Sequence, residues 1–124
     1  MRHIISILLQ NEAGALSRVT NLFSTRGFNI ESLNVAPTND ATVSRLTLVT
    51  IGSDAVIDQI SKHLGNLVDV MTIVDMTGTD HIERELALLK LRLPKGGREE
   101  LATVVEGFGG RIWDDHGGHF TVEL

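Results

Sequence analysis

Two short loops carry the residues whose types and spacing best suit the binding of a small ligand. The first loop covers residues 11–15, between an expected strand and an expected helix. Gly14 in this loop permits an unusual backbone angle and has no side chain to block a ligand. The N–H groups at the start of the helix, from Gly14 through Ala15 to Leu16, then favour a carboxylate. A plain strand-to-helix turn, in which Asn11 bonds to its own backbone, explains the same residues.

The second loop, residues 27–31, follows the expected helix. Asn29 begins the next strand, and its side-chain amide offers both a donor and an acceptor, which suits the two ends of a zwitterion. The structural alternative is helix-end chemistry, with Gly27 as the residue that ends the helix and Asn29 as a turn residue. Neither loop establishes a binding site by itself.

Other groupings of reactive side chains give weaker signals. Residues 114–119 hold two carboxylates and two imidazoles, a conceivable metal site, but Gly117 and Gly118 at their centre favour a hairpin turn between two strands. His3 and His63 are interpreted as isolated, on a strand edge and on an exposed helix face. The chain has no Cys and no grouping of Ser, His and Asp, so we expect neither a catalytic nor a metal-binding residue.

Hydrophobic periodicity indicates the elements that position the two loops. Strands are expected at residues 3–9, 29–36, 43–51 and 67–76, and helices at residues 14–26 and 54–64, with Ser53 as the N-cap of the second helix. The order strand-helix-strand-strand-helix-strand is that of the ferredoxin-like unit, an α+β fold.

The rest of the chain repeats this pattern at an offset of 82 residues, which takes Gly14 to Gly96. We therefore expect two domains, a complete unit at residues 1–77 and a truncated one at residues 78–124. The second copy stops after its third strand, without a second helix and a fourth strand, which leaves apolar surface and sheet edges uncovered. Either another chain covers this surface or the chain is a shortened form of the protein. The uncovered surface and edges predict a homo-oligomer, and a monomer with short, charged edges is the alternative. The elements of the second copy are expected at residues 85–93 (strand), 97–108 (helix) and 111–115 (strand).

The two copies share their apolar skeleton but differ at the polar candidates. At the same offset Asn11 is matched by Leu93, and Asn29 is matched by Arg111. Both copies have the apolar residues that the fold needs, but only the first has the two asparagines. This suggests that the first copy carries a binding site and the second does not.

Composition limits the possible partners. The chain has 124 residues, of which 42% are apolar and 22% are charged, as in a globular protein. Its net charge of −5 argues against nucleic acid or an anionic membrane as the main partner, because such binding needs a basic face. We expect no membrane span and no secretory leader, and hence a cytoplasmic protein.

The stretches ISILLQNEAGALSRV at residues 5–19 and RGFNIESLNVAPT at residues 26–38 closely resemble one family, the regulatory (small) subunits of acetolactate synthase. The strings SRLTL (44–48), LVDV (67–70) and EREL (83–86) strengthen the resemblance. It is specific from residue 1 to about residue 93 and looser from there to residue 124. Members of this family usually continue further and complete the second unit.

The resemblance implies that the first unit is an ACT domain, which pairs with its twin into a homodimer with a continuous sheet. The end product valine, with leucine or isoleucine as alternatives, is then expected to bind between the two copies. The subunit is expected to be non-catalytic and to need no cofactor, while thiamine diphosphate, Mg and FAD belong to the catalytic large subunit that it activates and places under feedback inhibition. The family's effector-binding positions correspond to Asn11, Gly14, Ala15 and Leu16 of one chain and to Asn29, Ile30 and Val35 of the other.

Three other classes of protein share the order of elements. A nucleic-acid binder of the RRM type needs stacking aromatics on its central strands, where this chain has residues such as Leu46 and Leu48, and it has no Tyr. A ferredoxin-like enzyme needs a polar cleft, which the sequence does not indicate. An ACT-type amino-acid sensor that regulates a different metabolic enzyme is the main alternative.

Overall fold

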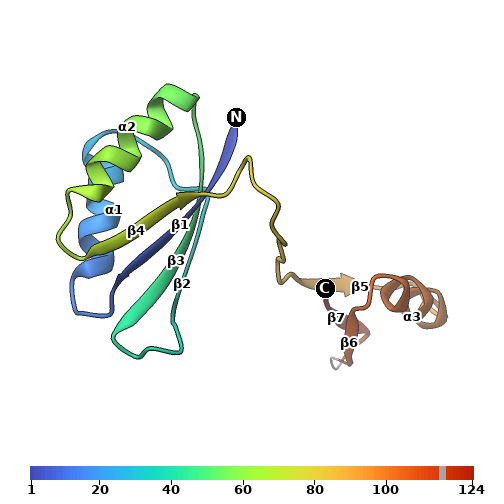
Figure 1. Cartoon of the computed structure of the whole chain (residues 1–124). Helices are drawn as coiled ribbons and strands as arrows, with labels where there is room; N and C mark the ends of the chain where they lie inside the picture. Colours follow the sequence, from blue (N-terminus) through green and yellow to red (C-terminus); the bar gives the residue numbers. More distant parts are fainter. Residues whose placement is uncertain (115–116) are drawn as a thin grey trace. The chain divides into compact units, whose positions relative to one another are not determined.

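The computed structural model describes residues 1–114 and 117–124, which form two compact units, Met1–His81 and Ile82–Leu124 (Figure 1). Among the described residues, no helix has the length and the apolar character that crossing a membrane requires.

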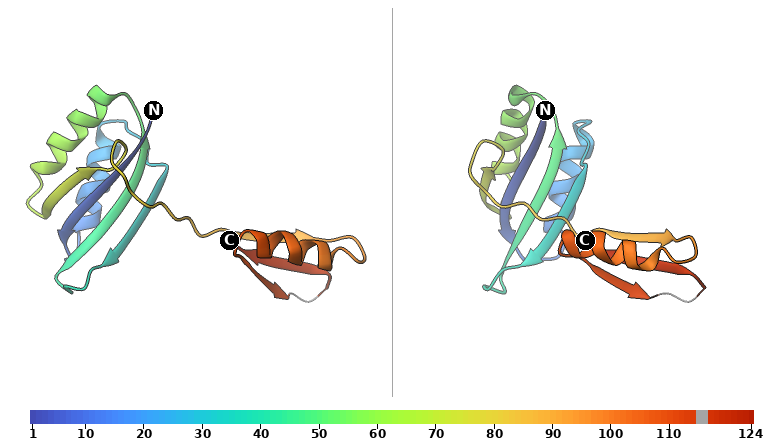
Figure 2. Two further views of the ribbon diagram at one scale, coloured as in Figure 1. Left: turned by 45° about the vertical axis from the view of Figure 1, so that its right-hand side comes forward. Right: turned by 90° about the vertical axis from the view of Figure 1, so that its right-hand side faces the viewer.

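The first unit is a two-layer structure of a four-stranded antiparallel sheet and two helices. Its strands lie in the order β2-β3-β1-β4, and both helices cover the same face, so that the other face of the sheet has no helix over it (Figures 1 and 2). This order confirms the expected ferredoxin-like topology. Its elements are β1 (Arg2–Gln10), α1 (Ala15–Thr25), β2 (Ser32–Pro37), β3 (Val43–Ile51), α2 (Asp54–Gly65) and β4 (Val70–Asp75).

The core lies between the sheet and the helices, because alternate residues of each central strand face the helical layer. Ile5 and Ile7 of β1 lie opposite Leu48 and Leu46 of β3, and all four side chains are fully buried. Each such side chain stabilises the fold by about 1.5–3 kcal/mol relative to an exposed one. The helices supply the other half of the core from residues at helical spacing: Ala15, Val19 and Phe23 of α1, and Ile57, Ile60 and Leu64 of α2.

Two strands of this unit are shorter than the periodicity indicates. β2 begins at Ser32 rather than at residue 29, because Thr50 and Val49 of β3 bond the preceding residues outside the regular ladder. β4 begins at Val70 rather than at residue 67, because residues 67–70 form a turn in which the Val70 N–H donates to the Leu67 carbonyl at 3.1 Å.

The second unit repeats the first half of this topology. Its sheet has the order β5-β7-β6, which corresponds to β1-β3-β2 of the first unit and confirms an incomplete ferredoxin-like copy. Val105 of the helix and Val122 of the central strand are buried together in its small core. Its elements are β5 (Leu88–Arg92), α3 (Arg98–Gly107), β6 (Arg111–Asp114) and β7 (His119–Glu123).

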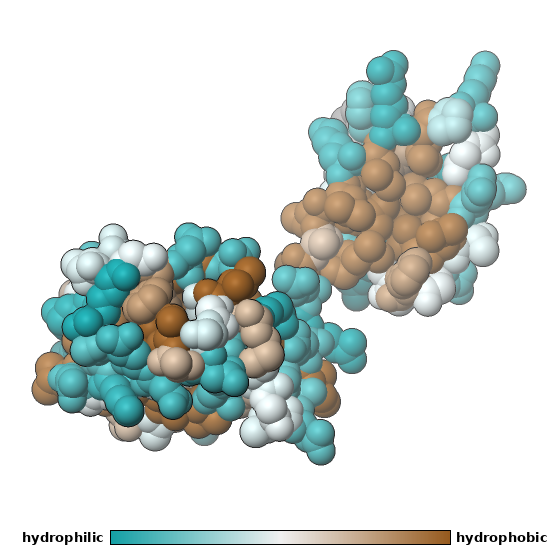
Figure 3. Space-filling model, turned by 90° about the horizontal axis from the view of Figure 1, so that it is seen from above, coloured by the Kyte–Doolittle hydropathy of each residue, from teal (hydrophilic) through white to brown (hydrophobic). Residues whose placement is uncertain are grey.

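Much of the second unit's apolar surface is uncovered. Leu89 of the edge strand β5 is 44% exposed, although its neighbour in the sheet, Val122, is buried. Figure 3 shows a broad apolar area on the face of this unit that it draws. The structure thus agrees with the expectation that a unit with one helix exposes apolar side chains. The other large exposed apolar side chains here include Ile82, Leu86, Leu88, Val104, Phe108 and Trp113.

Candidate functional site

The N-terminus of α1 has no side-chain cap, and of its first N–H groups that of Ala15 donates to the Glu12 carbonyl at 3.2 Å. Gly14 is its N-cap in a left-handed conformation, with φ +87°, and has no side chain with which to cap the helix. The first turn contains no acidic residue, whereas α2 begins with Ser53 as a side-chain cap followed by Asp54. A helix end of this kind favours an anion, because its N–H groups and its dipole both present positive charge.

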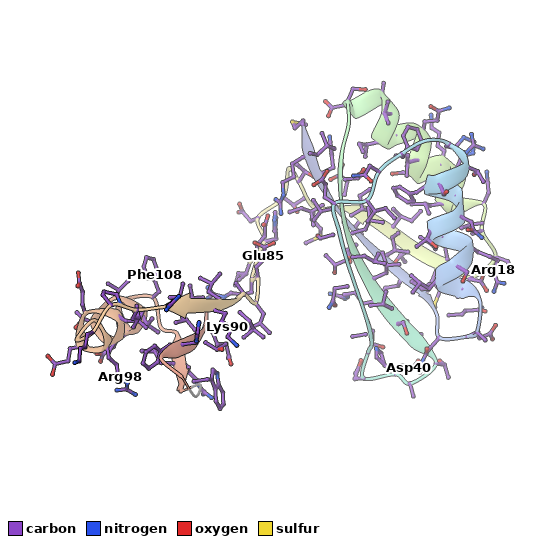
Figure 4. All side chains as sticks on the ribbon, turned by 180° about the vertical axis from the view of Figure 1, so that it is seen from behind. Arg18, Asp40, Glu85, Lys90, Arg98 and Phe108 are labelled. Carbon is purple, nitrogen blue, oxygen red and sulfur yellow. The ribbon has the colours of Figure 1, made fainter. Side chains whose placement is uncertain are left out.

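Arg18 adds a charged group beside this helix end. Its Nη1 lies 2.9 Å from the position that a Cβ on Gly14 would take, so the guanidinium borders the first turn of α1. Its Nε and Nη2 donate to the two carboxylate oxygens of Asp69, at 2.5 and 3.2 Å, and Figure 4 labels Arg18 on α1. Asp69 is buried, and the hydrogen bond from Arg18 lowers the pKa of its carboxyl below the ordinary value. The same bond raises the pKa of Arg18.

Asn11 is exposed at the end of β1 and is bonded to the turn between β2 and β3. Its backbone N–H donates to the Thr42 carbonyl at 2.8 Å, and its side-chain Nδ2 donates to the Ala41 carbonyl at 2.9 Å. The local alternative, in which Asn11 bonds to its own backbone, is therefore wrong for the side chain. The partner lies 30 residues away.

Asn29 and Ile30 lie at the opposite end of the sheet from Asn11. The Asn29 carbonyl accepts a hydrogen bond from Thr50 Oγ1 at 2.6 Å, and Thr50 pairs with His3 near the start of β1. Asn11 follows the last residue of the same nine-residue strand. At about 3.3 Å per residue the two ends of β1 are roughly 25 Å apart. One chain therefore does not bring Asn11 and Asn29 together.

The other candidate residues differ in what they make available. Ala15 is only 1% exposed and its backbone N–H donates to the Glu12 carbonyl at 3.2 Å, so the expected free N–H group at this position is already bonded, whereas Leu16 beside it is 39% exposed. Ile30 is half-buried and packs against the core. Val35 lies in β2, an edge strand in which every residue is exposed. Val35 and Leu33 are 37% and 39% exposed and pair with core residues of β3, which places them on the helix-covered side of that edge.

The residues that local sequence patterns missed are Arg18, Leu33 and the turn residues around Ala41. Arg18 and Asp69 are 51 positions apart, and no spacing rule connects them. The sequence did indicate Leu33, because it is two positions from Val35 and therefore lies on the same face of the edge strand.

His3 corrects an expectation. Its side chain is not isolated on a strand edge but buried in the central strand β1, with Nδ1 3.1 Å from Asp75 Oδ2 and Nε2 3.3 Å from Asp54 Oδ1. The ring lies between the start of α2 and the end of β4, and its buried Nε2 has no hydrogen-bond partner among the described residues. The expectation was wrong because the strand order, which makes β1 central, cannot be read from the periodicity of β1 alone.

In the part of the chain that the structure describes, no group of three or more His, Asp or Glu side chains is arranged to hold a metal ion. Two residues of the conceivable metal cluster, Asp115 and His116, lie outside the described residues. The strands on either side, β6 and β7, pair antiparallel from Asp114–Phe120 to Arg111–Glu123.

Comparison with known proteins identifies the family. A family model described as an AHAS small subunit-like ACT domain matches residues 5–72. The small subunit of acetolactate synthase isozyme 3 from Salmonella typhimurium is 50% identical over 124 residues, which is all of this chain and 76% of that protein. The small subunit of acetolactate synthase from Aquifex aeolicus is 39% identical over 99% of this chain and 65% of its own length.

Solved structures agree. The crystal structure of the acetolactate synthase small subunit from Thermotoga maritima matches all of this chain and 78% of its own, with a TM-score of 0.87 and 34% identity. The ACT domain of GTP pyrophosphokinase from Chlorobium tepidum has a TM-score of 0.54 at 15% identity, over 68% of this chain and 94% of its own, and shows the fold alone. The chain belongs to the acetolactate synthase small subunits, and so is a regulatory subunit with an ACT domain, not the catalytic one.

Proposed function

We propose that this subunit binds a branched-chain amino acid, valine foremost, between the first units of two copies of the chain. Binding there mediates feedback inhibition of acetolactate synthase, and the subunit also raises the activity of the catalytic large subunit. Leucine and isoleucine bind the same site more weakly, because one methylene changes the binding free energy by only about 1–3 kcal/mol. Thiamine diphosphate, Mg and FAD act in the catalytic partner.

The observation that carries the proposal is the position of the two asparagines at opposite ends of one sheet, with the exposed edge strand β2 beside them. Two β2 strands that pair antiparallel across a twofold axis bring the Asn29 end of each chain to the Asn11 end of the other. This arrangement generates two identical sites and covers an edge that would otherwise invite uncontrolled pairing.

The groups at the Asn11 end and at the Asn29 end of the sheet suit the binding of an α-amino acid. The carboxylate is expected at the N-terminus of α1, where Gly14 allows close approach of the ligand to the backbone. Asn11 and Asn29 supply the polar groups for the ligand. Val35 on the edge strand and Ile30 at the far end supply apolar contact for the branched side chain.

Inhibition follows from linkage. Valine inhibits only if it binds one conformation of the assembled enzyme more tightly than another, and such coupling is typically about 1–3 kcal/mol. By the same linkage, assembly with the catalytic subunit changes the affinity of this subunit for valine by the same factor.

Isothermal titration of the purified subunit tests the proposal, with valine, leucine, isoleucine and threonine as ligands. We expect one valine per site, two sites per dimer, and loss of binding in Asn29→Ala. Asn21→Ala, which removes the same side chain from the exposed surface of α1, is the matched control and should bind as the wild type does. Wild-type affinity in Asn29→Ala would exclude this site, and heat with threonine alone would indicate a different sensor.

A further inference from the structure

The turn between β2 and β3 contains several hydrogen bonds made by its own side chains. Asp40 Oδ1 accepts from the Thr42 hydroxyl at 2.7 Å and from the Thr42 backbone N–H at 3.0 Å. Thr38 Oγ1 accepts from the Asp40 N–H at 3.2 Å and donates to the Val43 carbonyl at 3.0 Å. The hydroxyl and backbone bonds from Thr42 lower the pKa of Asp40, so the carboxylate that organises the turn stays ionised. Figure 4 labels Asp40 at the tip of this turn.

The same β2–β3 turn also fixes the orientation of the Asn11 amide. Ala41 lies between Asp40 and Thr42, and its carbonyl accepts from Asn11 Nδ2 at 2.9 Å. A carbonyl oxygen only accepts hydrogen bonds, so the amide must present its nitrogen to Ala41 and turn its oxygen the other way. No residue that the structure describes donates to Asn11 Oδ1, and Asn11 is exposed. Asn11 therefore offers a ligand an acceptor.

We propose that Asp40 is a positioning residue of the effector site: through Thr42 and Ala41 it fixes the orientation of the Asn11 amide. In this orientation Asn11 Oδ1 accepts a hydrogen bond from the ammonium group of the ligand and does not contact its carboxylate. The proposal rests on the proposed function and deepens it. The carboxylate then lies at the N-terminus of α1 and the ammonium at Asn11, so each end of the amino acid meets a group of opposite polarity.

This division of roles predicts a particular selectivity. The 2-oxo acid with the carbon skeleton of valine has the same carboxylate and the same branched side chain, but no donor for Asn11 Oδ1. A site that hydrogen-bonds a donor rejects the analogue that lacks it, because its own polar group is left unpaired. The site should therefore distinguish the amino acid from its 2-oxo acid, and Asn11→Ala should reduce that preference.

The first arm of the test compares variants of Asp40 by titration with valine. Asp40→Ala should weaken binding by about tenfold, the loss expected when one hydrogen bond is misplaced. Asp40→Asn should bind nearly as the wild type, because its amide oxygen still accepts both bonds from Thr42. Asp58→Ala, which removes the same side chain from the exposed face of α2, is the matched control. Equal binding by Asp40→Ala and the wild type would overturn the proposal.

The second arm separates positioning from a general loss of structure. If Asp40 acts through Asn11, the double variant Asn11→Ala/Asp40→Ala should bind valine no more weakly than Asn11→Ala alone. Losses that add in full would mean that Asp40 stabilises the unit without positioning Asn11. The preference for valine over the 2-oxo acid, measured by NMR titration so that weak binding is quantified, should fall in both single alanine variants, and further in Asn11→Ala.

The third arm uses no ligand. The Asn11 Nδ2 hydrogen that bonds to Ala41, assigned by comparison with Asn11→Ala, should exchange more slowly in the wild type and in Asp40→Asn than in Asp40→Ala. If the wild type bound no branched-chain amino acid, the proposed function would fail and this proposal with it, whatever the exchange shows. If the wild type bound valine while the exchange rate and affinity of Asp40→Ala were unchanged, the positioning role alone would be wrong.

Discussion

At the scale of single residues, Gly14 joins the backbone geometry to the proposed ligand chemistry. Its φ of +87° is one that L side chains rarely adopt, and the Arg18 guanidinium borders the space above it. Gly96, its counterpart in the second unit, has the same φ of +87°, but a Cβ added to Gly96 would have no neighbouring atom within 4 Å. The pair thus separates the cost of the backbone angle from the effect of the site.

Gly14→Asp is expected to abolish the response to valine while the unit stays folded. The new carboxylate would occupy the N-terminus of α1 beside Arg18, where the ligand's own carboxylate should lie. The left-handed angle costs about 1 kcal/mol for an Asp. Gly96→Asp carries the same strain and should keep wild-type affinity. Titration with valine and urea unfolding of both variants check this, and retained binding in Gly14→Asp would contradict the assigned carboxylate position.

The sequence predicted which residues are candidates but not how they are held. Asn11 and Asn29 stood out because the repeat keeps the apolar skeleton and not these amides. The Ala41 carbonyl that orients Asn11, and the Asp69 carboxylate that holds Arg18, come from segments 30 and 51 residues away. Contacts over such separations follow from the strand order and from the path of the loops, which periodicity does not report.

At the scale of elements, the Arg18–Asp69 pair fastens the start of α1 to the turn before β4. Asp69 also accepts the N–H of Gln10, the last residue of β1, on its backbone carbonyl at 2.9 Å. Three elements that meet at the candidate site are therefore joined through Asp69. The order of elements was predictable because each has a clear period, whereas the starts of β2 and β4 were not, because bonds from neighbouring segments decide them.

Asp69→Asn should reduce the acid sensitivity of the first unit. The pKa of Asp69 is lowered in the folded state, so its ionised form stabilises the fold above the unfolded value of 3.8, and this stability is lost as the pH falls through the folded pKa. Urea unfolding from neutral pH to below 3.8 should therefore show a shallower decline for Asp69→Asn, from a lower starting stability because Arg18 has lost its anion. Asp58→Asn is the control and should follow the wild type. A parallel decline in Asp69→Asn would show that ionisation of Asp69 does not stabilise the fold.

At the scale of the whole molecule, the two units share a topology but differ in the side chains that they expose. The first unit is complete and has an exposed edge strand with polar candidates at both ends. The second unit keeps the apolar skeleton, has Leu93 and Arg111 where the first has the two asparagines, and exposes apolar side chains such as Leu89. The proposed site therefore needs two first units, because one chain holds its halves roughly 25 Å apart along β1.

A mixture of two inactive variants tests whether the site is shared between chains. Homodimers of Asn11→Ala and of Asn29→Ala should both bind valine much more weakly than the wild type, since every site in them lacks one amide. A mixed dimer has one site with both asparagines intact and one with neither, so unfolding and refolding the two variants together should restore part of the valine binding. The double variant Asn11→Ala/Asn29→Ala, refolded alone, is the control and should stay inactive. One variant is labelled with ¹⁵N, because the two variants have equal masses. If the co-refolded variants bound no valine although mass spectrometry showed dimers with one labelled chain, Asn11 and Asn29 would not act in one site across the β2 edge, and the twofold arrangement would be wrong.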